Sequence, residues 1–338
     1  MINYNNGRWI RHLAPVLAVG IIGVIVSIAV WYLTLTSENR AFEHGFFSRA
    51  DNQSVVLQSG IDDSWNLLSD VRALFEASSE VTREEFESFG KFLLRTRPAI
   101  LNIAWLPRIM REERAAHEAE AVRDGLSDYR IRAVVPDGSL PVSPEQNEYF
   151  PKFYSTEPRT SPVYGLDLND GGMRAGVIAR IRDGDLLSTS SPVTLHIGQG
   201  NRQGFWAALP VYARDLPHET VDDRRRNLRG VVQGVFQIDV LFDSIASAVK
   251  TPVRLYLFTP ESTIFDRSIY SASRAGTGRI EPKSQAQLTA SIHRSFPLNF
   301  GDVQWTVFVV PEPAYLPPSG HQSSFIVLIS GLLLSGCL

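Results

Sequence analysis

The residues best suited to chemistry are scattered along this chain and form no catalytic or metal-binding motif. The seven histidines, at positions 12, 44, 117, 196, 218, 293 and 321, include no pair spaced i, i+4 and no H-E-x-x-H motif that would place two imidazoles on one metal ion. The single cysteine, Cys337, can form neither an intrachain disulfide nor a cysteine-based zinc site. No G-x-S-x-G nucleophile elbow occurs. The sequence therefore predicts no catalytic residue, no metal and no cofactor.

A glycine-rich stretch, Gly198–Gly204, comes close to a dinucleotide-binding fingerprint but departs from it in two ways. Its last glycine comes one residue too late, and a strand is predicted after it where a helix should begin. We therefore interpret this stretch as the turn of a hairpin.

The densest group of candidate binding residues centres on Asp167, which lies between two leucines and is expected to be partly buried. A buried carboxylate needs hydrogen-bond donors, from either the protein or a ligand. The hydroxyl-rich segment Ser188–Ser191 follows, and Trp206 and Tyr212 lie on the next predicted strand. Aromatic walls with a few polar groups are typical of small-molecule sites.

A purely structural role for Asp167 explains the same pattern. Its carboxylate could cap or satisfy the helix predicted at Met173–Arg182, with Arg174 as a partner. Spacing alone leaves both interpretations open.

Two apolar runs predict membrane segments. Leu13–Leu35 is 23 residues without a charge, enough at about 1.5 Å per residue to cross a hydrocarbon core of about 30 Å. Arg8 and Arg11 precede it, so the positive-inside rule places the N-terminus in the cytoplasm. A cleaved signal peptide is the alternative, but this run is too long and lacks an A-x-A cleavage site. Phe325–Leu338 is too short to span; it is either a short hydrophobic tail or, in the interpretation we favour, the truncated start of a second transmembrane helix.

A long helix is predicted to follow the first membrane segment. Apolar residues recur at spacings of three and four, and no proline occurs between Thr36 and Arg97. The residues of this stripe are Leu57, Ile61, Trp65, Leu68, Val71 and Phe75. The stripe could pack within its own chain or against a second copy, and we expect a homodimer through the Thr36–Phe75 helix.

The region between the two apolar runs is called the outer region here. After the long helix, it alternates between short helices and strands. Thr82 and Glu85 form a capping box at the start of a helix that should stop before Pro98. The other predicted helices are Arg111–Arg123, Met173–Arg182 and Asp239–Val249, and Ala213–Arg229 is interpreted as an exposed loop. The predicted strands are Ile100–Met110, Tyr129–Val135, Leu186–Leu195, Gln203–Tyr212, Gly230–Ile238, Val253–Thr259, Ser291–Leu298 and Gln304–Val310. This pattern predicts an α+β fold with two small antiparallel sheets.

Several stretches in a fixed order resemble the CHASE domain, the extracytoplasmic sensor of histidine kinases and nucleotide cyclases. They cover about Phe86 to Tyr212, and the two flanking apolar runs match the family's setting between two membrane helices. The matching stretches are Trp105–Arg108 with Glu113 and Arg114, Tyr149–Pro151, Tyr164–Leu168, Arg174, Arg182–Gly184, Ser191 with Pro192, and Leu209–Tyr212.

The resemblance implies a long N-terminal helix followed by two tandem PAS-like modules, of which the membrane-distal one carries the ligand. In the plant members, which are receptors for adenine-type cytokinins, an aspartate matching Asp167 hydrogen-bonds the purine, and a strand matching Leu187 through Ser191 lines the pocket. Ala208 replaces a threonine of the plant pattern, so one cytokinin contact is missing here. The candidate ligand-binding residues are Asp167, Leu187, Thr189, Ser191, Trp206 and Ala208.

The organisation expected from these features runs from the cytoplasm outward and back to the membrane. Its segments are a cytoplasmic N-terminus (1–12), a transmembrane helix (13–35), a stalk helix (36–80), the distal ligand module (81–213), a boundary loop (214–229), the membrane-proximal module (230–312), a connector (313–324) and the start of a second transmembrane helix (325–338).

The predicted function is small-molecule sensing by a multi-pass receptor of the bacterial inner membrane, with the sensor in the periplasm. The ligand is unidentified and could be adenine-like, and the output, beyond Leu338, would be a histidine kinase or a diguanylate cyclase. A formal charge of −3, from 33 basic and 36 acidic residues, does not favour nucleic-acid binding. The alternative is a membrane-anchored extracytoplasmic enzyme or structural protein without signalling output.

Overall fold

The computed structural model describes residues 6–133, 135, 139–169, 173–197, 200–249, 252–260, 268–273, 278–316 and 322–336. The chain divides into two compact units, one of residues 53–310 and one of residues 1–52 together with 311–338. Each unit is described by itself below.

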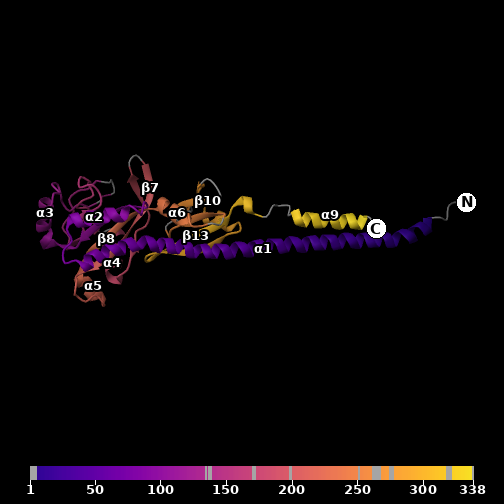
Figure 1. Cartoon of the computed structure of the whole chain (residues 1–338), viewed down its shortest axis with the longest axis horizontal. Coiled ribbons are helices and arrows are strands. Elements are labelled where there is room, and N and C mark those ends of the chain that lie inside the picture. The colour runs from indigo at the N-terminus through magenta and orange to yellow at the C-terminus, as the bar shows by residue number, and fades with distance from the viewer. Residues whose placement is uncertain are drawn as a thin grey trace. The chain divides into compact units, whose positions relative to one another are not determined.

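The elements confirm a mixed α+β fold that begins with a long helix (Figure 1). The helices are α1 (Asn6–Ala77), α2 (Arg83–Leu94), η1 (Arg111–Glu113), α3 (Arg114–Arg123), α4 (Met173–Gly184), α5 (Val221–Asn227), α6 (Ile238–Ala246), α8 (Gln285–Thr289), η2 (Pro313–Tyr315) and α9 (Gln322–Gly336). The strands are β1 (Ile100–Pro107), β2 (Ile109–Met110), β3 (Glu148–Tyr149), β4 (Tyr154–Ser155), β5 (Ser188–Thr189), β6 (Val193–Ile197), β7 (Gly200–Tyr212), β8 (Leu228–Gln237), β9 (Val253–Phe258), β10 (Tyr270–Ser273), β11 (Gly278–Arg279), β12 (Arg294–Phe300) and β13 (Val303–Pro311).

The larger sheet of the 53–310 unit, called the first sheet here, is antiparallel in the order β4-β1-β8-β7-β5, with β6 paired to β7. One face carries the first core cluster, in which side chains of β1, β7 and β8 pack against α4 and against Phe150 and Leu168. The opposite face packs on α1, because Trp65 of α1 contacts the rings of Phe205 and Phe236.

The second sheet of the same unit is also antiparallel, in the order β11-β10-β9-β13-β12. Its own small core joins Tyr256, Phe258 and Phe308 to Leu288 of α8. Helix α6 follows β8 of the first sheet and precedes β9 of the second, and its Phe242 contacts Tyr270 of β10 at 5.3 Å between ring centroids.

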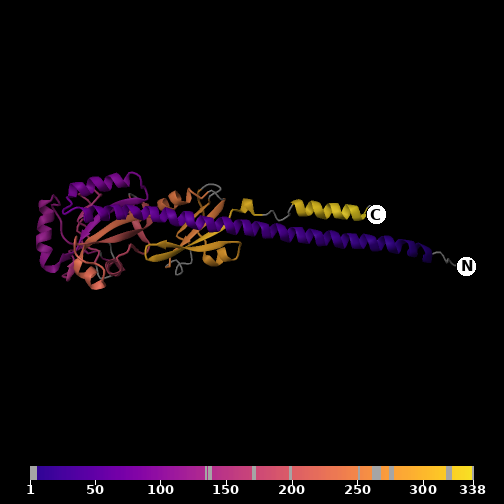
Figure 2. The same ribbon diagram turned by 60° about the horizontal axis from the view of Figure 1, so that its bottom comes forward.

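The part of α1 after residue 53 runs along both sheets, as the two views in Figures 1 and 2 show. The predicted stripe is its buried face, with Leu57, Ile61, Leu68 and Val71 fully buried. Trp65 lies at the centre of an aromatic cluster that is defined here as Trp65, Phe205, Phe236, Phe242, Phe300 and Trp305. Trp65 therefore packs within its own chain, which is one of the two interpretations left open by the sequence.

The predicted start of α2 is confirmed in detail. Thr82 is the N-cap, its side chain accepts a hydrogen bond from the Glu85 N–H, and Glu85 Oε2 accepts one from the Thr82 N–H at 2.9 Å. Two orphan donors at the helix start are thereby satisfied.

Two local predictions were wrong, and the bounds of a third element differ from those predicted. The described part of Tyr129–Val135 forms no regular strand: Arg132 makes isolated bridges to Val142 and Leu166, and the Ile131 N–H is bound by the Glu118 side chain. The interval Ala213–Arg229 contains helix α5, which Thr220 caps through the Asp223 N–H. The helix predicted at Asp239–Val249 is α6, which runs from Ile238 to Ala246 with Gln237 as its N-cap.

The unit of residues 1–52 and 311–338 carries most of the exposed large hydrophobic side chains among the described residues. Within the described residues, α1 is the one helix long and apolar enough to cross a membrane, with a mean hydropathy of 2.3 in its most apolar window, and Ile21, Ile22 and Leu33 are about 60% exposed. Helix α9 is 15 residues, about 22 Å long.

Candidate ligand site on the first sheet

Asp167 is fully buried and accepts hydrogen bonds from several protein groups. Oδ1 accepts from the backbone N–H of Phe150 at 2.7 Å and of Asn169 at 2.9 Å, and Oδ2 accepts from Gln146 Nε2 at 3.3 Å. Such charge-assisted bonds explain how a carboxylate can be buried. They fix the Phe150 and Leu168 segments to each other, and both residues cover the first sheet. The alternative partner, Arg174, has a side chain outside the described residues.

The hydroxyl-rich strand β5 directs its side chains to two opposite faces. Ser188 pairs with Ala208 of β7 and therefore points to the α4 side, whereas Thr189 pairs with Ala207 and points to the other side. Thr189 Oγ1 donates to the Phe300 carbonyl at 3.1 Å, at the end of β12. Leu187 and Thr189 therefore lie against the hairpin of the second sheet, away from Trp206 and Ala208.

The turn of that hairpin approaches β5 very closely. Gly301 has φ +64, and a Cβ there would lie 2.4 Å from the Leu187 carbonyl oxygen. Asp302 Oδ1 accepts from the Thr189 N–H at 3.3 Å. Glycine is required at this position both by the left-handed backbone and by the contact.

Arg180 of α4 contacts both β5 and the hairpin turn between β12 and β13. Its Nε lies 2.5 Å from Asp302 Oδ2, and its Nη2 donates to Ser188 Oγ at 3.2 Å and to the Thr189 carbonyl at 3.4 Å. The helix that covers the first core cluster is thereby tied to the second sheet through one side chain.

Trp206 and Ala208 lie together in the first core cluster, beside Phe150 and Leu168. Ser190 Oγ accepts from the Trp206 N–H at 3.1 Å and donates to the Ser191 carbonyl at 2.8 Å. The structure therefore brings Trp206 and Ala208 near the segment that Asp167 holds. It places Leu187 and Thr189 on the opposite face and leaves Ser191 partly buried beyond the end of β5.

Two polar residues that the sequence reasoning missed lie on the same face as Trp206 and Ala208. Asn102 of β1 is 6% exposed and Gln233 of β8 is 3% exposed, although each sits within an apolar strand. A polar residue at an inward position of an apolar strand is the signal that would have identified them.

A second set of buried polar side chains includes His117 of α3. Its Nε2 lies 2.9 Å from the Tyr129 hydroxyl, and its ring contacts Phe153. Burial lowers the pKa of His117 from 6.5 to about 4. Burial also raises the pKa of Tyr154, on the neighbouring strand β4, to about 12. Both groups are therefore neutral at physiological pH.

The neutral state of His117 should make stability depend on pH. Between pH 6.5 and 4 the unfolded chain binds a proton that the folded chain rejects, so the free energy of unfolding should fall as pH drops through this window. The full effect is about 3 kcal/mol, from a shift of two to three pKa units. Equilibrium unfolding between pH 8 and pH 4 should therefore show this slope in the wild type and lose it in His117→Gln.

His293→Gln is the matched control for this prediction, since His293 lies outside the buried group. The same pH slope in His117→Gln as in the wild type would show that His117 is not its source.

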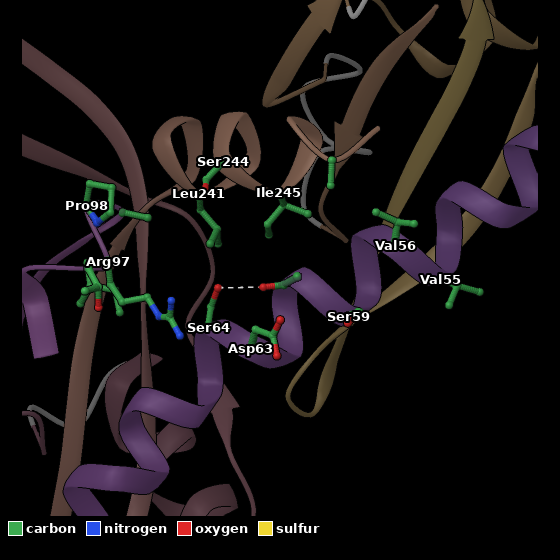
Figure 3. Close-up of a pocket in the computed structure, with 15 residues that line it drawn as sticks. Val55, Val56, Ser59, Asp63, Ser64, Arg97, Pro98, Leu241, Ser244 and Ile245 are labelled. Atoms are coloured by element: carbon green, nitrogen blue, oxygen red, sulfur yellow. Dashed lines mark hydrogen bonds between the residues drawn. The ribbon is translucent and has the colours of Figure 1, made fainter. Parts of the chain in front are cut away.

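A cavity lies elsewhere in the 53–310 unit, between α1, α6 and the loop before β1 (Figure 3). Its volume is about 540 Å³, and its walls include Val55, Ser59, Arg97, Leu241 and Ile245. Ser64 at its wall donates to the Gly60 carbonyl at 2.9 Å. None of the six predicted ligand-binding residues lines this cavity.

Comparison with known families gives one match. A family model described as the CHASE domain matches residues 79–270, which is more than half of the chain. Comparison with curated protein sequences found no match.

Comparison with solved structures gives weak similarities to sensory domains. An extracellular ligand-binding receptor from Desulfohalobium retbaense has a TM-score of 0.46 and 11% identity; the match covers 79% of this chain, which spans 40% of that receptor. The ligand-binding domain of the Pseudomonas aeruginosa amino acid chemoreceptor PctC, in complex with GABA, has a TM-score of 0.40 and 14% identity, covering 79% of this chain and 99% of that domain. The periplasmic sensory domain of the Campylobacter jejuni chemoreceptor Tlp1 has a TM-score of 0.41 and 10% identity, covering 81% and 94%. TM-scores below 0.5 do not establish a shared fold.

Proposed function

Because the chain belongs to the CHASE domain family, the sensory modules of signalling receptors, its outer region is a sensing module, and we propose that it binds a small molecule outside the bacterial inner membrane. The observation that carries this proposal is the ordered match over residues 79–270 behind a long apolar helix. The output would be a histidine kinase or a diguanylate cyclase.

We propose that α1 and α9 both cross the membrane, with the N-terminus in the cytoplasm and the sensor in the periplasm. Ile326, Ile329 and Leu333 of α9 are more than half exposed, which is costly in water and favourable in lipid. A Cβ at Gly331 would lie 2.4 Å from Ser27 Oγ of α1, so this glycine permits a close approach of the two helices. Small residues at such contacts are typical of membrane helix pairs.

The two sheets support a division of the outer region into two tandem PAS-like modules, at residues 81–213 and 230–312. Most of the first sheet and its core cluster come from the earlier interval, although β8 comes from the later one. The second sheet lies entirely within the later interval. Residues 36–80 would be the stalk, 214–229 the boundary and 313–324 the connector.

We propose the α4-facing side of the first sheet as the ligand site, with Asp167, Trp206 and Ala208 as ligand-facing residues. Leu187, Thr189 and Ser191 would not contact the ligand; they would connect the site to the second sheet. Asp167 would then have two roles, since it also holds the Phe150 segment.

Signal transmission would use the contacts around Arg180. A ligand under α4 changes the balance between two arrangements only if it binds them with different affinity. Movement of α4 would shift Arg180 and therefore Asp302 in the turn between β12 and β13, which leads on to α9. The membrane-proximal half of Thr36–Phe75 would provide the homodimer contact that carries the change inward.

The ligand role of Asp167 can be tested in the full chain in detergent with a thermal-shift screen of adenine derivatives and other small metabolites. For the first compound that raises the melting temperature, Asp167→Asn should abolish most of the shift, because it replaces a charged acceptor by an amide while keeping one oxygen for the Phe150 N–H. Asp167→Ala is less informative because it would leave that N–H buried without a partner.

Asp215→Asn is the matched control for this experiment, because the Asp215 side chain is 89% exposed. A ligand-induced shift that is equal in Asp167→Asn and in the wild type would remove Asp167 from the site.

A further inference from the structure

Two buried amide oxygens on the first sheet have no hydrogen-bond partner among the described residues. They are Asn102 Oδ1 and Gln233 Oε1. A buried acceptor that is left unsatisfied destabilises a protein, so native structures contain few. Two of them on neighbouring strands call for a common explanation.

Strand register places both residues on the α4 side of the sheet. Gln233 pairs with Ala104 of β1 and with Ala208 of β7, and both alanines belong to the first core cluster. Asn102 pairs with Val235, which packs against the same cluster. Asn102 and Gln233 are therefore diagonal neighbours, a separation that long side chains can bridge.

Chemistry fixes the orientation of the Asn102 amide. Nδ2 donates to Glu157 Oε1 at 2.6 Å, and a carboxylate can only accept. The amide nitrogen must therefore face Glu157, which leaves Oδ1 as the end that lacks a partner.

The surroundings of Gln233 offer little to a bridging water. Along its row across the sheet the residues are Ser155, Ala104, Gln233, Ala208 and Ser188. The two serines lie two strands away on either side, roughly 10 Å, and each hydroxyl already accepts a hydrogen bond, from the Glu157 N–H and from Arg180. A buried water needs two to four polar partners, and alanine methyl groups supply none.

We propose that Asn102 Oδ1 and Gln233 Oε1 form an acceptor pair that selects a ligand with two N–H donors on one edge, such as an amidine, a guanidine or an amino-substituted heterocycle. This inference rests on the proposed sensing function. The small side chains of Ala104 and Ala208 leave the Gln233 amide as the long polar group of its row, and Trp206 beside it provides an aromatic surface for a planar ligand.

The first test needs no ligand. Gln233→Met keeps the length of the side chain and removes the buried oxygen, so the melting temperature of the empty full-length protein should rise by roughly 2–6 °C. Gln203→Met, at an exposed position of β7, should leave it unchanged. A lower melting temperature for Gln233→Met would show that the amide has a structural partner and would overturn the proposal.

The second test uses three probes of the same shape on the full chain in detergent: benzamidine, benzamide and benzoate. Benzamidine should raise the melting temperature most and benzamide less, while benzoate, which only accepts hydrogen bonds, should not raise it. Gln233→Met should remove the difference between the probes and Gln203→Met should retain it. Equal shifts for benzamidine and benzoate, or no shift with benzamidine, would overturn the proposed ligand class.

The outcomes separate this inference from the sensing function. A metabolite whose shift depends on Asp167 but is unchanged in Gln233→Met would leave the function standing and refute the acceptor pair. A shift with benzamidine that depends on Gln233 but not on Asp167 would support the pair and refute the role of Asp167.

Discussion

Gly165→Ala is expected to be strongly destabilising for the 53–310 unit. Gly165 has φ +81, and an added Cβ would lie 2.0 Å from the Arg130 carbonyl oxygen, which belongs to rigid backbone. Its own N–H and carbonyl bind Lys152 and Arg132, so the turn cannot move without breaking both bonds. Left-handed strain and overpacking together should cost about 4 kcal/mol in free energy of unfolding, measured by denaturant titration of the full chain.

Gly125→Ala separates the two causes of this loss. Gly125 also has a left-handed φ, +89, but the nearest atom to an added Cβ is the end of the Arg159 side chain at 3.6 Å. This variant should lose only about 1–2 kcal/mol, since it carries the backbone strain without the clash. Equal losses in the two variants would refute the importance of the Arg130 contact. Because Gly165 lies two residues before Asp167, Gly165→Ala should also weaken ligand binding.

Arg83→Met should strongly destabilise the 53–310 unit. The Arg83 side chain is fully buried at the start of α2, where Nε lies 2.6 Å from Asp124 Oδ2 and Nη1 donates to the Phe153 carbonyl at 2.8 Å. The guanidinium also stacks 4.8 Å from the Tyr154 ring centroid. Its removal should cost about 3 kcal/mol, at the lower end for a buried ion pair because Asp124 is one-third exposed and can be hydrated.

Arg159→Met is the control, since Arg159 pairs with Glu84 and Glu87 at the surface. Exposed ion pairs contribute little, so this variant should lose less than about 1 kcal/mol. A loss as small as this in Arg83→Met would show that Arg83 can be replaced by any side chain that fills its space.

Local signals in the sequence were enough to predict the elements whose stability is local. The capping box at Thr82 and Glu85 defined the start of α2, and the three-and-four spacing from Leu57 to Phe75 defined the buried face of α1. The predictions failed where the secondary structure depends on a partner that is distant in the sequence. Residues Tyr129–Val135 have a strand-like pattern, but the Glu118 side chain binds the Ile131 N–H, and Arg132 makes only isolated bridges to Val142 and Leu166.

The candidate site could be predicted only in part for the same reason. The leucines around Asp167 indicated burial, yet its donors come from Phe150 and Gln146, which no spacing relates to it. Alternation along β5 indicated that neighbouring side chains point to opposite faces of the sheet, but not which of them points toward α4. That depends on the pairing of Ser188 with Ala208, a long-range contact.

The aromatic cluster around Trp65 has a consequence for how this region can change during evolution. Trp65 touches Phe205 and Phe236 from one sheet and Phe300 from the other, and Phe300 stacks on Trp305 at 4.0 Å. If either sheet were replaced by that of a divergent relative, its aromatic rings would not pack against the rings of the sheet that is kept. Recombination that exchanges one sheet alone is therefore disfavoured, and the two sheets are expected to be inherited together with the helix that carries Trp65.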